Sequence, residues 1–519
     1  MHIETAFVTL FSVATAVALV ARWIKIPYTV ALVVAGLVLG SVRAIEPPHL
    51  TKELLYALFL PGLLFEAAFH LDALKFWQNK WAIHLLAVPG VAAAIGLTAL
   101  LLQPVANALH FVDGFAMKHA LVFAALIAAT DPIAVVALFK SLGVPKRLAI
   151  LVEGESLLND GTAVVFFTLI FGVVSEGSGS FSLGVAALDF VRVVGLGTLV
   201  GATVGYLASK LTQRVDDPMI EITLTTIAAY GSFLFAEHFH LSGVIATVAA
   251  GMLCGNYGAR TGMSPSTRIA VESFWEYVAF ALNSIVFLLI GFEVHLEALV
   301  RSWQAILVAY LAVTVGRAAL IYVVTFFLRR TKETLPWSWS AVMTWGGLRG
   351  GLSMVLVLAL PKAFPHRELL VTMTFGVVIL SILIQGLSMT VLLRRLGLTG
   401  VRGDRIDYER ERGILRAKSA ALSALERMQK DGAVHSVAAA QLRSEYEGAM
   451  ADAEMRMKDL HLQAEDLREE EERATRRQLL LSEKDALLGA LRNGYLSQDI
   501  GDQLLEDVDA RLIQLESES

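Results

Sequence analysis

The sequence predicts an all-α polytopic membrane protein with thirteen transmembrane helices, and three observations carry this prediction. Its 519 residues are 55% hydrophobic and only 18% charged, whereas soluble domains carry roughly 25% charged residues. Apolar runs recur from residue 4 to residue 394, and a helix of about 20 such residues crosses a bilayer. Two of these runs are interrupted in the middle, one at a proline and one at a glycine cluster.

The predicted spans place the N-terminus outside and the C-terminus in the cytoplasm of a plasma (inner) membrane. Cytoplasmic loops are enriched in Lys and Arg, and one set of alternate loops carries most of these residues. The basic loops include Lys140/Lys146/Arg147, Lys210/Arg214, Arg260/Arg268 and Arg329/Arg330/Lys332. The spans cover approximately 4–22, 28–42, 53–71, 81–103, 116–140, 147–174, 186–210, 219–237, 241–258, 270–293, 299–328, 337–361 and 367–394.

The fifth span contains an acidic residue next to a helix breaker, in the motif Thr130-Asp131-Pro132. Proline lacks an amide hydrogen and clashes with the preceding turn, so it leaves backbone carbonyls free inside the membrane. Such backbone is tolerated only where it is buried in protein or lines a cavity. Asp131 could simply cap the helix that follows, but a capping role does not exclude ion binding.

The sixth span carries further polar residues at helical spacing. Ser156 and Asp160 are four residues apart and share one face, while Glu155 and Asn159 repeat that spacing on the adjacent face. An ionisable group at membrane depth is costly and predicts a functional site. Glu66 on the third span follows a Pro-Gly pair; it either lies solvated near a membrane face or faces the cavity of Asp131 and Asp160.

Two arginines stand in the eleventh and twelfth spans. Arg317 lies in the middle of its span, where it needs a partner or a water-filled path. The twelfth span reads Gly346-Gly347-Leu348-Arg349-Gly350-Gly351, a composition unfavourable for a continuous helix. We expect Arg349 to neutralise a buried carboxylate, with Glu155 as the best candidate. Interrupted spans in matching positions of two halves indicate an inverted-repeat transporter with its site near the midplane.

Three motifs carry a family resemblance: Thr130-Asp131-Pro132, the segment from Glu155 to Asp160, and the segment from Gly346 to Gly350. Together they resemble the motifs of monovalent cation/proton antiporters of the NhaP/NHE type, and the resemblance covers roughly residues 5–395. The resemblance implies a homodimer, in which a core bundle moves against a dimerisation domain. It also implies that five residues surround the ion, partly through water, while Glu155 and Arg349 pair to hold the core. The five residues are Asp160, Asp131, Thr130, Ser156 and Glu66.

Exchange can also be argued from the residues themselves. An alkali cation needs about six hard oxygen ligands, or fewer with water, and Asp160, Asp131, Ser156 and the Thr130 carbonyl supply oxygens. Two neighbouring carboxylates in a low-dielectric cavity are costly to ionise together, so one proton is held when no cation is bound. Na⁺, or Li⁺ or K⁺, then competes with H⁺ for one site. Because Asn159 stands beside Asp160 where a second carboxylate could have carried a second proton, we expect electroneutral exchange.

Two other classes of protein remain as alternatives: a cation channel with an acidic filter, and an intramembrane aspartyl protease using Asp131 and Asp160. The paired interruptions speak against the channel. The protease would be expected to carry Tyr-Asp and Gly-x-Gly-Asp motifs, which this sequence lacks. We therefore expect a transporter with roles in pH and sodium homeostasis rather than an enzyme, with no cofactor, the lipid bilayer as its surroundings and no nucleic-acid partner.

The charge distribution divides the chain into a membrane domain, 1–396, and a cytoplasmic helical tail, 397–519. Residues 401–519 hold 18 Lys and Arg against 26 Asp and Glu, whereas residues 1–400 hold 25 against 22. Within the tail, Ser482 to Asp485 is typical of a helix N-terminus. Within the membrane domain we assign the core bundle to about 81–174 and 299–394 and most of the remainder to the dimerisation domain.

Overall fold

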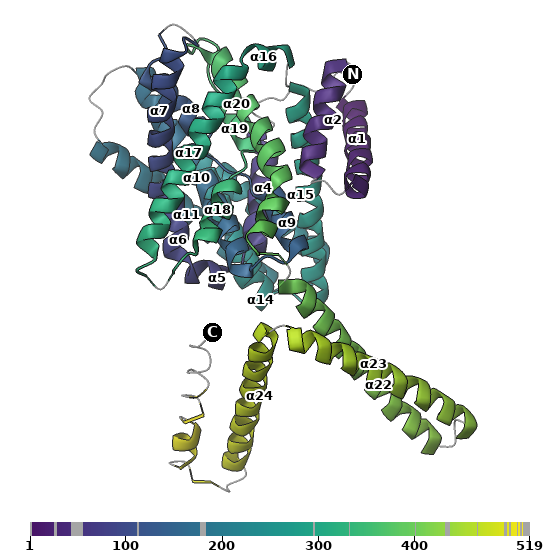
Figure 1. Ribbon diagram of the computed structural model, residues 1–519. Helices are drawn as coiled ribbons and strands as arrows, with labels where there is room; N and C mark the ends of the chain where they lie inside the picture. Colours follow the sequence, from purple (N-terminus) through teal and green to yellow (C-terminus); the bar gives the residue numbers. More distant parts are fainter. Residues whose placement is uncertain are drawn as a thin grey trace. The chain divides into compact units, whose positions relative to one another are not determined.

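The computed structural model describes residues 3–24, 28–42, 55–111, 114–176, 183–293, 296–331, 333–399, 401–430, 436–463, 465–492 and short stretches up to Arg511. The chain divides into two compact units, Met1–Leu398 and Thr399–Ser519. Among the described residues every regular segment is a helix (Figure 1). The all-α prediction is therefore confirmed.

The first unit is a bundle of helices, several of which contain short π-helical segments, labelled η. Its elements are α1 (Ile3–Ile24), α2 (Tyr28–Val42), η1 (Leu55–Phe59), α4 (Leu60–His70), α5 (Ala73–Gln78), α6 (Lys80–Leu85), η2 (Leu86–Gly90), α7 (Val91–Ala108), α8 (Met117–Leu126), α9 (Ile133–Leu142), α10 (Lys146–Glu176), α11 (Leu183–Thr212), α12 (Pro218–His238), α13 (Gly243–Leu253), η3 (Cys254–Gly258), α14 (Ala259–Thr261), α15 (Pro265–Glu293), α16 (Leu296–Arg301), α17 (Trp303–Leu328), α18 (Trp337–Trp345), α19 (Gly351–Leu358), α20 (Arg367–Leu380), η4 (Ser381–Gly386) and α21 (Leu387–Arg395).

Within the described residues, seven continuous helical segments are long and apolar enough to cross a membrane, and shorter apolar helices accompany them. The seven cover 80–108, 146–175, 184–212, 218–238, 266–292, 303–328 and 367–395. Helical segments lie within each of the thirteen predicted ranges. The number of crossings stays a prediction, because several of the ranges contain only short or broken helices.

Both predicted interruptions are present. The helix of the fifth range stops at the end of α8 and resumes at α9, and that of the twelfth range stops at the end of α18 and resumes at α19. The two irregular connections meet, because the backbone N–H of Asp131 donates to the carbonyl of Leu348 at 2.8 Å. Each break thus satisfies backbone groups that the other exposes, which is what an interruption inside a membrane requires.

Close helix contacts also occur elsewhere in the first unit. On α11, Gly201 lies so near α13 that a Cβ atom there would stand 1.9 Å from the carbonyl oxygen of Ala246. On α15, a Cβ at Gly291 would stand 2.3 Å from the carbonyl oxygen of Val33 on α2. Small residues let helix backbones approach in this way, which favours packing in lipid.

The second unit contains α22 (Val401–Lys430), α23 (Ser436–Gln463) and α24 (Glu465–Arg492). Helices α22 and α23 form an antiparallel hairpin (Figure 1). Two ion pairs show the antiparallel order: Glu426 near the end of α22 pairs with Arg443 near the start of α23 at 3.2 Å, and Glu411 earlier in α22 pairs with Arg456 later in α23 at 3.1 Å. The predicted helix start at Ser482 is wrong, because α24 is already helical from Glu465; strong helix formers on both sides outweigh the local capping pattern.

Candidate functional site

A cavity of about 430 Å³ lies beside the crossing of the interrupted helices, with walls from α4, α9, α10, α15 and α19. All five residues predicted to surround an ion line it: Glu66, Thr130, Asp131, Ser156 and Asp160. Glu66 is thus one of the residues around the same cavity as the two aspartates. Its side chain is 25% exposed and faces the cavity that contains the two aspartates.

Two hydrogen bonds fix Asp131, one made by its backbone and one by its side chain. Its N–H donates to Leu348 of the other interrupted helix, while its Oδ1 accepts from the N–H of Ile133, the first residue of α9, at 3.1 Å. The capping role considered for Asp131 is therefore present. It uses one oxygen, and Asp131 still lines the cavity, so capping and ligation are compatible.

Hydrogen bonds orient the neutral oxygens of the site. Ser156 Oγ donates to the Thr130 carbonyl, and Thr130 Oγ1 lies 3.3 Å from Ser156 Oγ. Asn159 Nδ2 donates to Thr130 Oγ1 at 3.1 Å. A hydroxyl has one donor and two lone pairs, and a carbonyl has two lone pairs. With the hydroxyl protons engaged inside the network, Ser156 Oγ and the Thr130 carbonyl each keep a lone pair for a cation.

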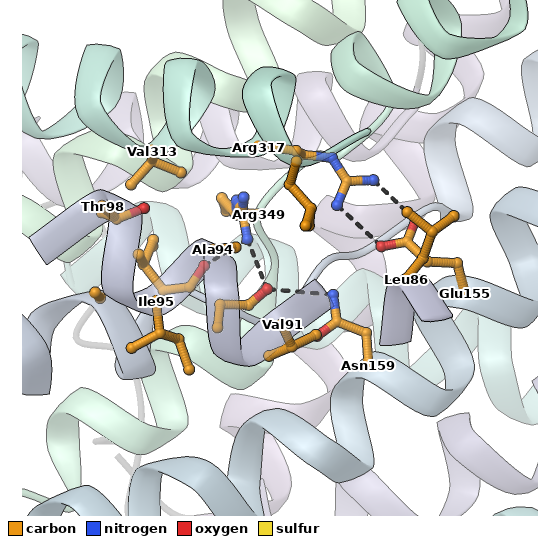
Figure 2. Close-up of a pocket in the computed structure, with 14 residues that line it drawn as sticks. Leu86, Val91, Ala94, Ile95, Thr98, Glu155, Asn159, Val313, Arg317 and Arg349 are labelled. Carbon is orange, nitrogen blue, oxygen red and sulfur yellow. Dashed lines mark hydrogen bonds and ion pairs between the residues drawn. The ribbon is translucent and has the colours of Figure 1, made fainter. Parts of the chain in front are cut away.

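Glu155 forms a buried ion pair with Arg317 rather than with Arg349 (Figure 2). The guanidinium donates two parallel hydrogen bonds, Nη1 to Oε1 at 2.9 Å and Nη2 to Oε2 at 2.8 Å. Arg317 also donates to the Met343 carbonyl from Nε and Nη2. The predicted Glu155–Arg349 pair is therefore wrong. Helix rotation brings Arg317 in from α17, and the spacing of residues along the sequence does not show that rotation.

Arg349 instead binds the end of the first half-helix. Its Nη1 donates to the carbonyls of Ile127 and Ala128, at 2.6 and 2.7 Å, and to that of Ala129 at 3.2 Å. The last carbonyls of a helix have no partners within it and carry partial negative charge. A guanidinium there satisfies the carbonyls that the break at Pro132 leaves free, so Arg349 supports the geometry of the interruption.

Helix α10 separates the cavity from a second, much smaller space. Ser156 and Asp160 line the large cavity, whereas Glu155 and Asn159 line a space of about 20 Å³ together with Arg317 and Arg349. Asn159 and Arg349 both donate to the Ala128 carbonyl there (Figure 2). The two faces inferred from the helical spacing are thus distinct, one bearing the candidate ligands and the other the charges that hold the helices together.

The glycines of the twelfth range give the charged side chains room. A Cβ at Gly350 would stand 2.4 Å from both Cβ and Oδ2 of Asp131, and a Cβ at Gly347 would stand 2.2 Å from Nε of Arg317. Both contacts are shorter than real Cβ atoms allow. These glycines therefore do more than interrupt the helix, because they also allow the close approach of Asp131 and Arg317.

Four further polar residues line the large cavity and were not predicted as part of the site: His70, Lys140, Glu153 and Asn283. His70 Nδ1 lies 3.3 Å from Glu66 Oε1, one helical turn away. The spacing of Glu66 and His70 could have indicated this contact. Asn283 is followed by Ser284 in a mainly apolar stretch of α15, and no pattern in the sequence distinguishes it from a packed polar residue.

Comparison with known proteins agrees with this architecture. Residues 8–395 match the family described as "Sodium/hydrogen exchanger, transmembrane". The chain is 41% identical over 385 residues to the Na⁺/H⁺ antiporter ApNhaP of Aphanothece halophytica, a match covering 74% of this chain and 72% of that protein. It is 32% identical over 501 residues to the Na⁺/H⁺ antiporter NhaG of Bacillus atrophaeus, covering 94% of this chain and 93% of that protein.

A solved structure has the same fold. The sodium proton antiporter MjNhaP1 from Methanocaldococcus jannaschii superimposes with a TM-score of 0.61 at 18% identity, over 76% of this chain and 99% of that one. The matched family covers the interrupted helices, the large cavity and both buried arginines. This chain therefore belongs to the sodium/hydrogen exchanger family.

Proposed function

We propose that this protein exchanges Na⁺ for H⁺ across a membrane at the cavity that contains Asp131 and Asp160. The observation that supports this best is the meeting of two carboxylates, from two different helices, with correctly oriented neutral oxygens at a helix break. The names of the relatives agree, since ApNhaP and NhaG are both Na⁺/H⁺ antiporters.

The proposed ligands are Asp160, Asp131, Ser156 Oγ and the Thr130 carbonyl, with Glu66 contributing through water. These are hard oxygen donors of the kind that alkali cations take. Without a cation, two carboxylates that line one cavity inside the membrane domain repel each other, so a proton is retained. Cation and proton therefore exclude each other from one site, and exchange follows if only the loaded site changes its access.

The proposed function also includes the orientation of the chain in the membrane, its moving core and its assembly. The N-terminus lies outside and the tail lies in the cytoplasm, as the basic loops predict. The helices of 81–174 and 299–394 form a core that moves against the rest of the membrane domain within a homodimer. The physiological role is sodium and pH homeostasis at the plasma membrane.

The direct test uses the purified full chain in proteoliposomes with an imposed pH gradient and an entrapped pH indicator. We expect Na⁺ to dissipate the gradient, with Li⁺ and K⁺ compared at equal concentration and choline as the inert control. Protein-free liposomes measure the leak. A gradient that no alkali cation dissipates faster than choline would refute the exchange activity, and dissipation with choline alone would indicate a proton leak instead.

Exchange is expected to be electroneutral, with one cation moving against one proton. Asn159, beside Asp160, carries no titrating group, and its amide is engaged by the Ala128 carbonyl and Thr130 Oγ1. The buried base opposite Glu155 is Arg317, and arginine remains protonated at any workable pH. The check is the exchange rate with the membrane potential clamped by K⁺ and valinomycin. A rate that depends on potential, or a turnover-linked current on a solid-supported membrane, would contradict one-for-one exchange.

Removing the tail after Leu398 should preserve exchange and change its rate or its pH dependence. Every residue that lines the large cavity precedes residue 356, and the tail forms a compact unit of its own. The measurement compares pH profiles of the full chain and the truncated protein in proteoliposomes, after confirming equal insertion by quantitative immunoblot. Complete loss of exchange from a correctly inserted truncated protein would show that the tail is required for transport.

A further inference from the structure

We infer that Asn283 on α15 is a further ligand residue for the cation, one that sets cation affinity and selectivity without taking part in proton binding. The inference rests on the proposed exchange at the Asp131–Asp160 cavity. Asn283 lines that cavity together with Val286 and Phe287. Residues three and four apart share a helix face, so this face of α15 is directed at the site, and Asn283 is its polar member.

The packing of α19 brings this face close to Asp131. A Cβ at Gly350 would collide with Asp131, and a Cβ at Gly351 would stand 2.8 Å from Cγ1 of Val286. Consecutive Cα atoms are about 3.8 Å apart. The adjacent residues Gly350 and Gly351 therefore lie between Asp131 on one side and Val286 on the other. Asn283 lies about one helical turn before Val286 on α15.

The environment of Asn283 leaves the amide available to a ligand. The residue is 5% exposed, and within the described part of the chain no hydrogen bond to its side chain is formed. A buried amide without a partner is unfavourable, so the cavity must supply one, as water or as a hydrated cation. The neighbours Val286 and Phe287 offer no alternative donor or acceptor.

The chemistry of an amide fits a selective role. Its carbonyl oxygen is a hard, uncharged ligand, and an amide does not titrate, so it attracts the cation without competing for the proton. Asp131 and Asp160 present carboxylates to the cavity, and Asn283 adds a neutral oxygen from α15, which is continuous from Pro265 to Glu293. Removal of this ligand should weaken cation binding and leave the proton-binding carboxylates intact.

The test measures the apparent KM and maximum rate for Na⁺ and Li⁺ in proteoliposomes containing the full chain. For Asn283→Ala we expect the KM for Na⁺ to rise roughly fivefold, the size of one neutral polar contact, with an unchanged maximum rate and an altered Na⁺/Li⁺ preference. Asn283→Asp should lower the KM at alkaline pH. Ser284→Ala is the matched control, since Ser284 is the next residue on α15, is buried and does not belong to the cavity lining.

The outcomes separate this inference from the proposed function. If the wild-type protein exchanges Na⁺ for H⁺ and Asn283→Ala matches it in KM and in Na⁺/Li⁺ preference, the ligand role is refuted while the function stands. A fall in rate and thermal stability at unchanged KM would also refute it, since that pattern marks a packing role. Should Asn283→Ala not fold, Asn283→Ser is measured instead. Its oxygen lies on a shorter side chain, so the KM for Na⁺ and the Na⁺/Li⁺ preference should both change, and wild-type values of both would refute the ligand role.

Discussion

Asp160→Asn should reduce Na⁺-driven proton movement to the level of protein-free liposomes while the protein remains folded. The change keeps the shape of the side chain but removes the group that alternates between cation and proton. Asp160 lines the large cavity on the same face of α10 as Ser156, so its loss removes the charge at the centre of the proposed ligand set. Dissipation of the pH gradient is the measurement, and thermal unfolding in detergent checks the fold.

Glu153→Gln is the matched control for this result. Glu153 is another carboxylate of α10 that lines the same cavity, two helical turns from Asp160, and the change is equally isosteric. We expect this variant to retain exchange with at most a changed apparent affinity. Flux of wild-type size from folded Asp160→Asn protein would remove Asp160 from the mechanism, and complete inactivity of both variants would mean that any charge in the cavity is essential.

The features that local chemistry determines could be predicted from the sequence. Pro132 removes a backbone donor whatever surrounds it, so the break before α9 was predictable, and clustered glycines disfavour a helix in the same way at Gly350. The shared cavity of Asp131 and Asp160 was also predictable, since a carboxylate at membrane depth must reach water, a cation or a partner.

The features that depend on helix rotation and on close approach between distant segments could not be predicted. The sequence favoured Arg349 as the partner of Glu155, whereas the structure pairs Glu155 with Arg317. The choice between them depends on the side from which α17 meets α10, and on the space that Gly347 leaves for the Arg317 guanidinium. Asn283 was missed for a similar reason, since an amide in an apolar helix becomes informative only once its face is known to line a cavity.

Glu155 and Arg317 should behave as one energetic unit. Both are buried, with 3% and 7% of their surface exposed, and their bidentate contact is the geometry in which an arginine–carboxylate pair is strongest. Removing one partner leaves an uncompensated charge, which costs about 3–5 kcal/mol. Glu155→Gln and Arg317→Met should therefore each lower thermal stability markedly, whereas the double variant should lose much less than the sum of the two.

The same cycle with Arg349 in place of Arg317 provides the contrast. Arg349 Nη1 donates to three backbone carbonyls, so its removal should be costly by itself but nearly additive with Glu155→Gln. Arg317→Lys should recover only part of the stability, because an ammonium cannot reproduce the two parallel hydrogen bonds. The measurement is the unfolding midpoint of each purified variant in one detergent. Additive losses for Glu155 and Arg317, or stronger coupling of Glu155 to Arg349, would contradict the assignment of the ion pair.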